Sequence, residues 1–258
     1  FSGGTGHTTT DGTFTTTTGC TLSYTRYLPN SNLTDKTVVM MHGFLRNKDR
    51  FAGWGSHIAS WDIPSVAVTM CNSAMWNADA DANAADVLEL MDHLALQEVF
   101  YMGHSNGGIS AIQAASLDNN ALGALGLDPV ENFGTDHTPQ AASLSVPAYT
   151  LVGESSSCND SNSGVAAFKA APNSSALMVS EAGHCDFEFP TDALCQVAPG
   201  CSGTNNTFSD EQIQNTVVGL GTAFMRWSLF NDSDAKNWWT PGQNAYEALA
   251  KSGAIQPL

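Results

Sequence analysis

Residues 98–108 read EVFYMGHSNGG, and this stretch decides the fold that the sequence predicts. Its first half consists of strand-forming residues, and the run stops at Ser105 before the chain continues in glycines. The pattern is Gly-x-Ser-x-Gly. When this pattern joins a strand to a helix, the tight turn exposes the serine hydroxyl at the end of the sheet. Gly103 and Gly107 allow the tight turn and the close approach of strand and helix. We therefore interpret Ser105 as a candidate nucleophile.

Strands and helices alternate on both sides of this stretch. Continuous apolar runs are typical of strands that are buried on both faces, and segments with apolar residues at helical spacing separate them. The sequence therefore predicts an α/β fold, with a mostly parallel central sheet and helices on both faces. The expected strands are 37–41, 65–70, 98–103, 121–127, 147–153 and 175–181, and the expected helices are 50–60, 81–95, 108–117 and 210–230.

A single domain is expected over residues 1–258, because no linker or repeat interrupts the pattern. Residues 1–10 are expected to form a loose N-terminus. The Thr-rich run at 8–17 is expected to form a hairpin that turns at Asp11 and Gly12, since Asp-Gly favours tight turns.

The composition limits the classes of function. The chain has 25 acidic and 9 basic residues, with a formal net charge of −16. Such a surface repels nucleic acids and anionic membranes, so no nucleic-acid partner is expected. No apolar run approaches the ~20 residues that a membrane helix requires, so no stable membrane insertion is expected. We expect a monomer.

A serine nucleophile needs a base and an acid that orients the base. His184 follows the last predicted strand, and the chain order serine, acid, histidine places the base last. Two carboxylates end intervening strands, Asp128 and Glu154. We favour Asp128, because Pro129 stiffens the exit from its strand and a shorter side chain is more easily fixed beside an imidazole. Glu154 is the alternative acid.

Two backbone amides are candidates for an oxyanion hole, which binds the negative charge that develops on the substrate oxygen. One is the amide of Asn106, directly after Ser105, and the other is the amide of Phe44, in the loop after the strand at 37–41. The Phe44 side chain is also a candidate substrate contact.

Several other polar and aromatic residues are interpreted mainly as structural supports. His42 is interpreted as a brace for the loop that carries the first amide, and His104 as a support for the serine turn. Asp79 and Asp81 are interpreted as a solvated helix start, and no metal site is predicted. Trp76 is either a loop anchor or a substrate contact, and we include it among the candidate substrate-binding residues.

These stretches resemble the α/β-hydrolase superfamily over about residues 10–240. Residues 42–60, 66–73, the loop around Cys158 and the tail at 223–234 resemble bacterial cutinases and polyester hydrolases. A second set of motifs resembles chlorophyllases: MHGFLRNKDRFAGWGSHIAS (41–60), GHSNGG (103–108), GLDPVEN (126–132) and GHCDFE (183–188).

The two resemblances imply different acids. Chlorophyllases carry a DPV motif, and pancreatic-type lipases a similar GLDP stretch, which implies Asp128. Polyester hydrolases place their acid later, near Glu154, but Ser156 lies close to the matching position. Asn106 also departs from both families, since chlorophyllases have Arg there and polyester hydrolases have Met.

The chain has six cysteines and no CxxC motif, which favours disulfides over a metal ribbon and predicts a secreted protein. Polyester hydrolases often join the acid loop to the histidine loop by a disulfide, which implies the first of three expected pairs. In the second pair, the two cysteines are close in sequence. The third pair joins the two cysteines that remain. The expected pairs are Cys158–Cys185, Cys195–Cys201 and Cys20–Cys71.

Together these features predict a secreted serine carboxylic-ester hydrolase of the esterase, lipase or cutinase type, which acts through an acyl-enzyme without a cofactor. Only 18 residues separate Asp128 from Pro147, which leaves no room for a large cap domain. The site should be open and suited to bulky or polymeric esters. The alternatives are a chlorophyllase-type hydrolase, an acyltransferase with the same triad, and a non-catalytic binding module.

Overall fold

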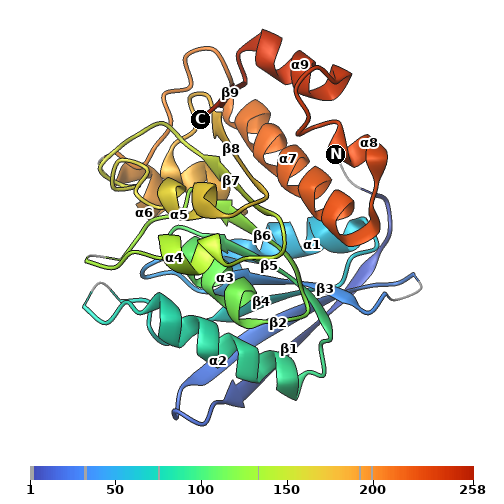
Figure 1. Ribbon diagram of the computed structural model, residues 1–258, viewed down its shortest axis with the longest axis vertical. Coiled ribbons are helices and arrows are strands. Elements are labelled where there is room, and N and C mark those ends of the chain that lie inside the picture. The colour runs from blue at the N-terminus through green and yellow to red at the C-terminus, as the bar shows by residue number, and fades with distance from the viewer. Residues whose placement is uncertain (1–2, 32–33, 75, 133, 192, 199) are drawn as a thin grey trace.

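The computed structural model describes residues 3–31, 34–74, 76–132, 134–191, 193–198 and 200–258. The described residues form one sheet of nine strands in the order β1-β2-β4-β3-β5-β6-β7-β8-β9 (Figure 1). Strands β4, β3, β5, β6, β7 and β8 pair in parallel, whereas β1, β2 and β9 pair antiparallel at the two edges. The strands are β1 (His7–Thr15), β2 (Thr21–Pro29), β3 (Lys36–Met41), β4 (Ser65–Thr69), β5 (Glu98–His104), β6 (Ala121–Leu127), β7 (Ala148–Val152), β8 (Ser174–Val179) and β9 (Ile255–Pro257).

Helices cover both faces of this sheet (Figure 1), which confirms the predicted α/β architecture. Helices α1 (Ala52–Ser60) and α7 (Asp210–Phe230) pack on one face. Helices α2 (Ala80–His93), α3 (Asn106–Leu117) and α5 (Val165–Ala170) pack on the other. The remaining helical segments are η1 (Lys48–Phe51), α4 (Thr138–Ala142), η2 (His184–Phe187), α6 (Ala193–Val197), α8 (Ser233–Lys236) and α9 (Asn244–Ser252).

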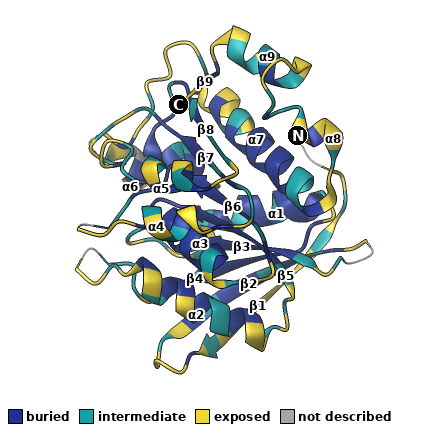
Figure 2. Ribbon diagram, viewed as in Figure 1, coloured by how far each residue is buried: buried dark blue, intermediate teal, exposed yellow. Residues whose placement is uncertain are grey.

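The central strands bury both of their faces. In β5, Phe100 and Met102 belong to the core beneath α1 and α7, while Val99 and Tyr101 belong to the core beneath α2 and α3. Figure 2 shows the buried strands between helices whose outer faces are exposed. Because neither face of β5 meets water, its apolar run is continuous.

The N-terminal segment differs from the prediction. β1 begins at His7, inside the stretch expected to be loose, and passes straight through Asp11 and Gly12, so the predicted hairpin is wrong. The Tyr24 ring of β2 occupies the space that a side chain at position 12 would need. Lys48 Nζ lies 2.9 Å from Asp11 Oδ1. These tertiary contacts outweigh the local turn signal of Asp-Gly.

The turn that joins β1 to β2 lies further along the chain. The Thr16 N–H donates to Cys20 O at 2.8 Å, and Gly19 adopts a left-handed φ of 88° within the turn. A disulfide then joins Cys20 to Cys71, just beyond β4, as the sequence predicted. The bridge holds the N-terminal hairpin against the parallel part of the sheet.

The connection between β6 and β7 is short. In its described residues, the segment between β6 and β7 contains one short helix, α4, which leaves this edge of the sheet without a large cap. Asp79 caps α2, because its side chain accepts a hydrogen bond from the Ala82 N–H at 2.9 Å. No helix within the described ranges is long and apolar enough to span a membrane.

Candidate active site

Ser105 lies in the turn between β5 and α3, with φ 57° and ψ −131°. This conformation costs a non-glycine residue about 1–3 kcal/mol, so the surrounding contacts must hold it. The Ser105 N–H donates to Leu127 O at 3.0 Å, and the Gly108 N–H donates to Ser105 O at 2.9 Å. A side chain at Gly103 would come within 1.9 Å of the Gly107 backbone, so the turn requires glycine there. The predicted strand–turn–helix around Ser105 is therefore present.

His184 and Asp128 are in direct contact. His184 Nδ1 lies 2.6 Å from Asp128 Oδ2, and both side chains are buried. An ionised carboxylate only accepts hydrogen bonds, so Nδ1 carries the ring proton and Nε2 keeps its lone pair. Ser105 and His184 line the same cavity. Such an arrangement can transfer a proton from the serine hydroxyl to the imidazole.

The second oxygen of Asp128 is held by two donors. Oδ1 accepts from the Gly153 N–H at 2.8 Å and from Asn159 Nδ2 at 3.3 Å. Asn159 is fully buried, and its side chain also donates to Glu154 O at 2.9 Å and accepts from the Ser156 N–H at 2.9 Å. Sequence reasoning missed Asn159, because one asparagine in a polar loop carries no local signal of this role.

Glu154, the alternative acid, has different partners. Its Oε1 accepts from the Glu181 N–H at 3.2 Å, and its own N–H donates to Ala182 O at 2.9 Å. These bonds join the end of β7 to the loop that leads to His184. In the structure, therefore, Asp128 contacts the imidazole and Glu154 supports the backbone before it.

The amides of Phe44 and Asn106 flank Ser105. Asn106 is the first residue of α3, so its N–H has no partner within the helix. Phe44 follows Gly43, where an added Cβ would lie 2.6 Å from the Ser105 Cβ, and glycine thus lets this loop approach the serine. Neither N–H donates a hydrogen bond to another residue in the described part of the chain. Both amides are therefore available to an oxyanion beside Ser105.

Two buried histidines brace this arrangement, as the sequence predicted. His42 Nε2 accepts from the Met70 N–H at 2.9 Å, so Nδ1 carries the proton and donates to Gly43 O at 2.7 Å. Burial lowers the pKa of His42 from its ordinary value of 6.5 to about 4. His104 Nε2 donates to His184 O at 2.9 Å, and burial lowers the pKa of His104 well below its ordinary value. Both rings are therefore neutral near pH 7.

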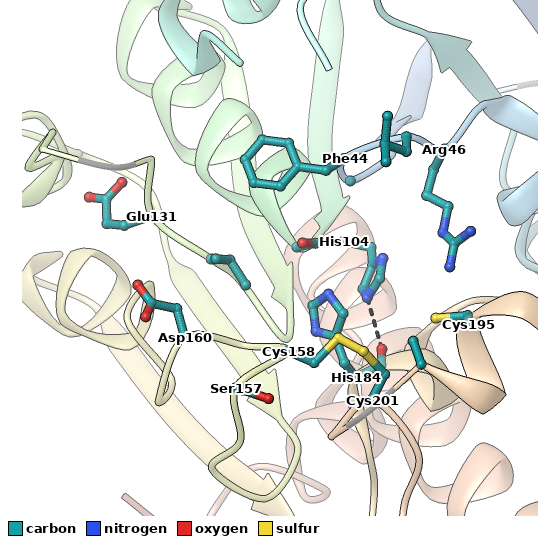
Figure 3. Close-up of a pocket in the computed structure, with 15 residues that line it drawn as sticks. Phe44, Arg46, His104, Glu131, Ser157, Cys158, Asp160, His184, Cys195 and Cys201 are labelled. Atoms are coloured by element: carbon teal, nitrogen blue, oxygen red, sulfur yellow. Dashed lines mark hydrogen bonds between the residues drawn. A yellow bond between two sulfur atoms is a disulfide. The ribbon is translucent and has the colours of Figure 1, made fainter. Parts of the chain in front are cut away.

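The cavity beside Ser105 and His184 has a volume of about 460 Å³. Figure 3 shows Phe44 above the two histidines, with Arg46 on one side and the carboxylates of Glu131 and Asp160 on the other. Sequence reasoning missed the charged lining, since surface charges in loops carry no signal of a shared cavity. The other lining residues are Gly43, Leu45, His104, Val130, Ser157, Cys158, Cys195, Ala198 and Cys201.

Trp76 is absent from the described residues that line this cavity. Its side chain is 86% exposed. The Leu45 N–H donates to Ser73 O at 2.8 Å, which places the loop of Trp76 beside the loop of Phe44. A substrate contact at Trp76 therefore stays a prediction.

Two of the three expected disulfides are wrong. Cys158 pairs with Cys201, and Cys185 pairs with Cys195, whereas direct Cys158–Cys185 and Cys195–Cys201 bridges were expected. The short helix α6 and the turn after it direct Cys195 and Cys201 toward different loops. The acid loop and the histidine loop are thus joined indirectly, because the segment from Cys195 to Cys201 is bridged to both and lines the cavity.

In comparisons with known proteins, no protein family and no curated protein matches this chain. Among the residues whose placement is described, no group of three or more His, Cys, Asp or Glu side chains is arranged to hold a metal ion.

Proposed function

We propose that this chain is a serine carboxylic-ester hydrolase with an α/β-hydrolase fold. The observation that carries the proposal is the joint placement of three groups. Ser105 occupies a strained turn at the end of β5, and it shares a cavity with His184, whose Nδ1 lies 2.6 Å from Asp128. The chain order serine, aspartate, histidine also supports the α/β-hydrolase assignment.

In the proposed reaction, Ser105 Oγ attacks the ester carbonyl carbon while His184 Nε2 accepts the hydroxyl proton. The amides of Phe44 and Asn106 stabilise the negative charge that develops on the carbonyl oxygen. The C–O bond to the alcohol then breaks, and His184 returns the proton to the departing oxygen. Water repeats the sequence on the acyl-enzyme, with His184 as the base, and releases the acid. Asp128 holds the imidazole in the required tautomer throughout.

The cavity supports a preference for esters with apolar groups. Its volume of about 460 Å³ falls in the range of small-molecule sites. Phe44, Leu45 and Val130 supply apolar lining, and the short β6–β7 connection leaves the entrance open. An open entrance is compatible with long or polymeric chains. We also propose that the protein is secreted, because disulfides persist in oxidising compartments.

Active-site labelling tests the proposal directly. A fluorophosphonate should add one covalent label per chain at Ser105, detectable by intact-protein and peptide mass spectrometry. Ser105→Ala should abolish both labelling and ester turnover, and His184→Ala should lower the rate by 10⁴-fold or more, roughly 5 kcal/mol of transition-state stabilisation. Ser116→Ala, at the far end of α3, is the matched control and should label normally.

The outcomes separate the alternatives. Absence of labelling in the wild-type protein would indicate a binding module, and a Ser105→Ala variant with more than a few per cent of activity would refute the mechanism. A panel of p-nitrophenyl esters of increasing chain length, with polyester film and chlorophyll, would identify the substrate class. Product analysis with added alcohol would reveal acyl transfer in place of hydrolysis.

A further inference from the structure

We infer that Arg46 and Glu188 form a positioning bridge that fixes the loop of the Phe44 amide relative to His184. The inference rests on the proposed function, because it assigns a role in the reaction to two residues that do not belong to the triad. The argument depends on where the bridge lies, which two loops it joins and what it contacts.

The bridge is an ion pair between a buried carboxylate and a partly buried guanidinium. Arg46 Nε lies 2.8 Å from Glu188 Oε1, and the two side chains are 15% and 1% exposed. A buried ion pair contributes little net stability relative to apolar residues of the same size, since desolvation offsets the attraction. Stability alone therefore explains poorly why two charged side chains lie at this place. A requirement for a fixed distance between their two loops explains it.

The two partners belong to the two loops that the reaction must align. Arg46 closes the tight turn that contains Phe44, because its N–H donates to Gly43 O at 3.3 Å. Glu188 directly follows η2, the single turn that begins at His184, and its N–H donates to Cys185 O at 3.2 Å. The ion pair therefore links the loop that carries Phe44 to the loop that carries His184.

Neighbouring backbone bonds join the same two segments. The Phe189 N–H donates to Arg50 O at 2.9 Å, and the Gly53 N–H donates to Phe189 O at 2.6 Å. These bonds hold the segment that follows η2 against the segment that follows the Phe44 loop. The ion pair lies on the cavity side of this junction, since Arg46 lines the cavity with Ser105.

The His104 ring lies beside both Glu188 and His184. Its Nδ1 lies 3.8 Å from Glu188 Oε1, and its Nε2 donates to the backbone oxygen of His184 at 2.9 Å. The rings of His104 and His184 are 4.4 Å apart, and Figure 3 shows them side by side with Arg46 beyond. Glu188 therefore lies behind the proposed base, with the His104 ring between them.

The expected consequence is a loss of rate without a loss of binding. Misplacement of reacting groups by about 1 Å can lower a rate by roughly 100-fold. Ground-state binding of a small neutral ester depends on the apolar lining and should change little. A contact between Arg46 and an anionic substrate would instead alter KM, and selectively for anionic esters.

The test removes both charges together, because Arg46→Met alone would take a cation away from the buried Glu188 carboxylate. The double variant Arg46→Met/Glu188→Gln should lower kcat for p-nitrophenyl butyrate by roughly 10- to 100-fold and leave KM within about threefold. Arg46→Lys keeps the positive charge but not the guanidinium geometry, and it should fall between wild type and the double variant.

The matched control is the ion pair of Arg226 and Asp232, whose Nε and Oδ2 atoms are also 2.8 Å apart. This pair lies at the end of α7 and does not line the cavity. Arg226→Met/Asp232→Asn should leave kcat unchanged. Melting temperatures of all variants would identify any loss of rate that follows from unfolding.

Three results would overturn the inference: an unchanged kcat in the Arg46/Glu188 double variant, a kcat that falls equally in the control, or a rise in KM confined to an anionic ester such as a p-nitrophenyl hemisuccinate. If the double variant failed to fold, Arg46→Lys would decide, since wild-type kcat in that variant contradicts a geometric role. Failure of the proposed function is distinguishable, because the wild-type protein would then show no ester turnover, and the positioning role would fall with it.

Discussion

Acidification from pH 7 to pH 4 should destabilise the protein through His42, which braces the loop that carries Gly43 and Phe44. The ring is buried, receives the Met70 N–H at Nε2 and donates from Nδ1 to Gly43 O. A proton added to Nε2 would remove the acceptor for Met70 and place a charge where water cannot solvate it. The perturbation is therefore a single protonation at a known atom.

The magnitude follows from the two pKa values of His42. Burial lowers the folded-state pKa to about 4, whereas the unfolded chain has the ordinary value of 6.5. Between these values the unfolded chain binds a proton that the folded chain does not, so stability falls as the pH falls through this window. The stability lost through His42 amounts to about 3 kcal/mol at pH 4, the small remainder is lost below the folded-state pKa, and the effect is nearly absent above pH 7.

Urea unfolding at intervals from pH 7 to pH 4 measures this effect, with His42→Gln as the comparison. Glutamine offers a side-chain oxygen as acceptor but does not titrate, so the variant should lose about 3 kcal/mol less than wild type over the same range. Every other titrating group contributes equally to both proteins. His93→Gln, in the last turn of α2 where the ring is exposed, is the control for the loss of an imidazole. A free-energy difference between wild type and His42→Gln that stays constant with pH would refute the reasoning.

Asp128→Asn should lower kcat by about 10⁴-fold, because an amide no longer enforces the Nδ1–H tautomer of His184. Glu154→Gln should leave kcat within about threefold of wild type. The reverse order in steady-state assays would transfer the role of acid to Glu154. Replacing Cys158 and Cys201 by serine removes a bridge between residues 43 positions apart, worth about 4 kcal/mol by loop-closure entropy. Its melting temperature should fall, and activity should be lost on heating before circular dichroism changes; simultaneous loss would argue against a bridge that organises the site. Asn159→Leu should cost about 1–3 kcal/mol in urea unfolding and lower kcat as well, because it removes a donor from the Asp128 carboxylate; wild-type kcat would show that this hydrogen bond does not orient the acid.

Much of the architecture was predictable because its signals are local. The apolar run of β5, the glycines around Ser105 and the helical spacing of α3 each specify their conformation within a few residues. The alternation of such segments is enough to indicate a parallel sheet with helices on both faces. The sequence also indicated that Ser105 and His184 each follow a strand of the predicted parallel sheet.

The choice of acid depended on tertiary structure. Asp128 and Glu154 both follow parallel strands, so chain order and strand ends do not separate them. The structure separates them by distance, since Asp128 Oδ2 reaches His184 Nδ1 while Glu154 accepts from the Glu181 backbone. Asn159, which donates a hydrogen bond to Asp128, likewise has no local sequence signal for this role.

The disulfides and the buried ion pair depended on tertiary structure still more strongly. The resemblance to polyester hydrolases implied a Cys158–Cys185 bridge, but each of these cysteines is instead bonded to the segment from Cys195 to Cys201. The sequence by itself determined conformations that arise from contacts within a few residues. The pairing of distant side chains was decided only by tertiary structure, because it depends on where the whole sheet carries each loop.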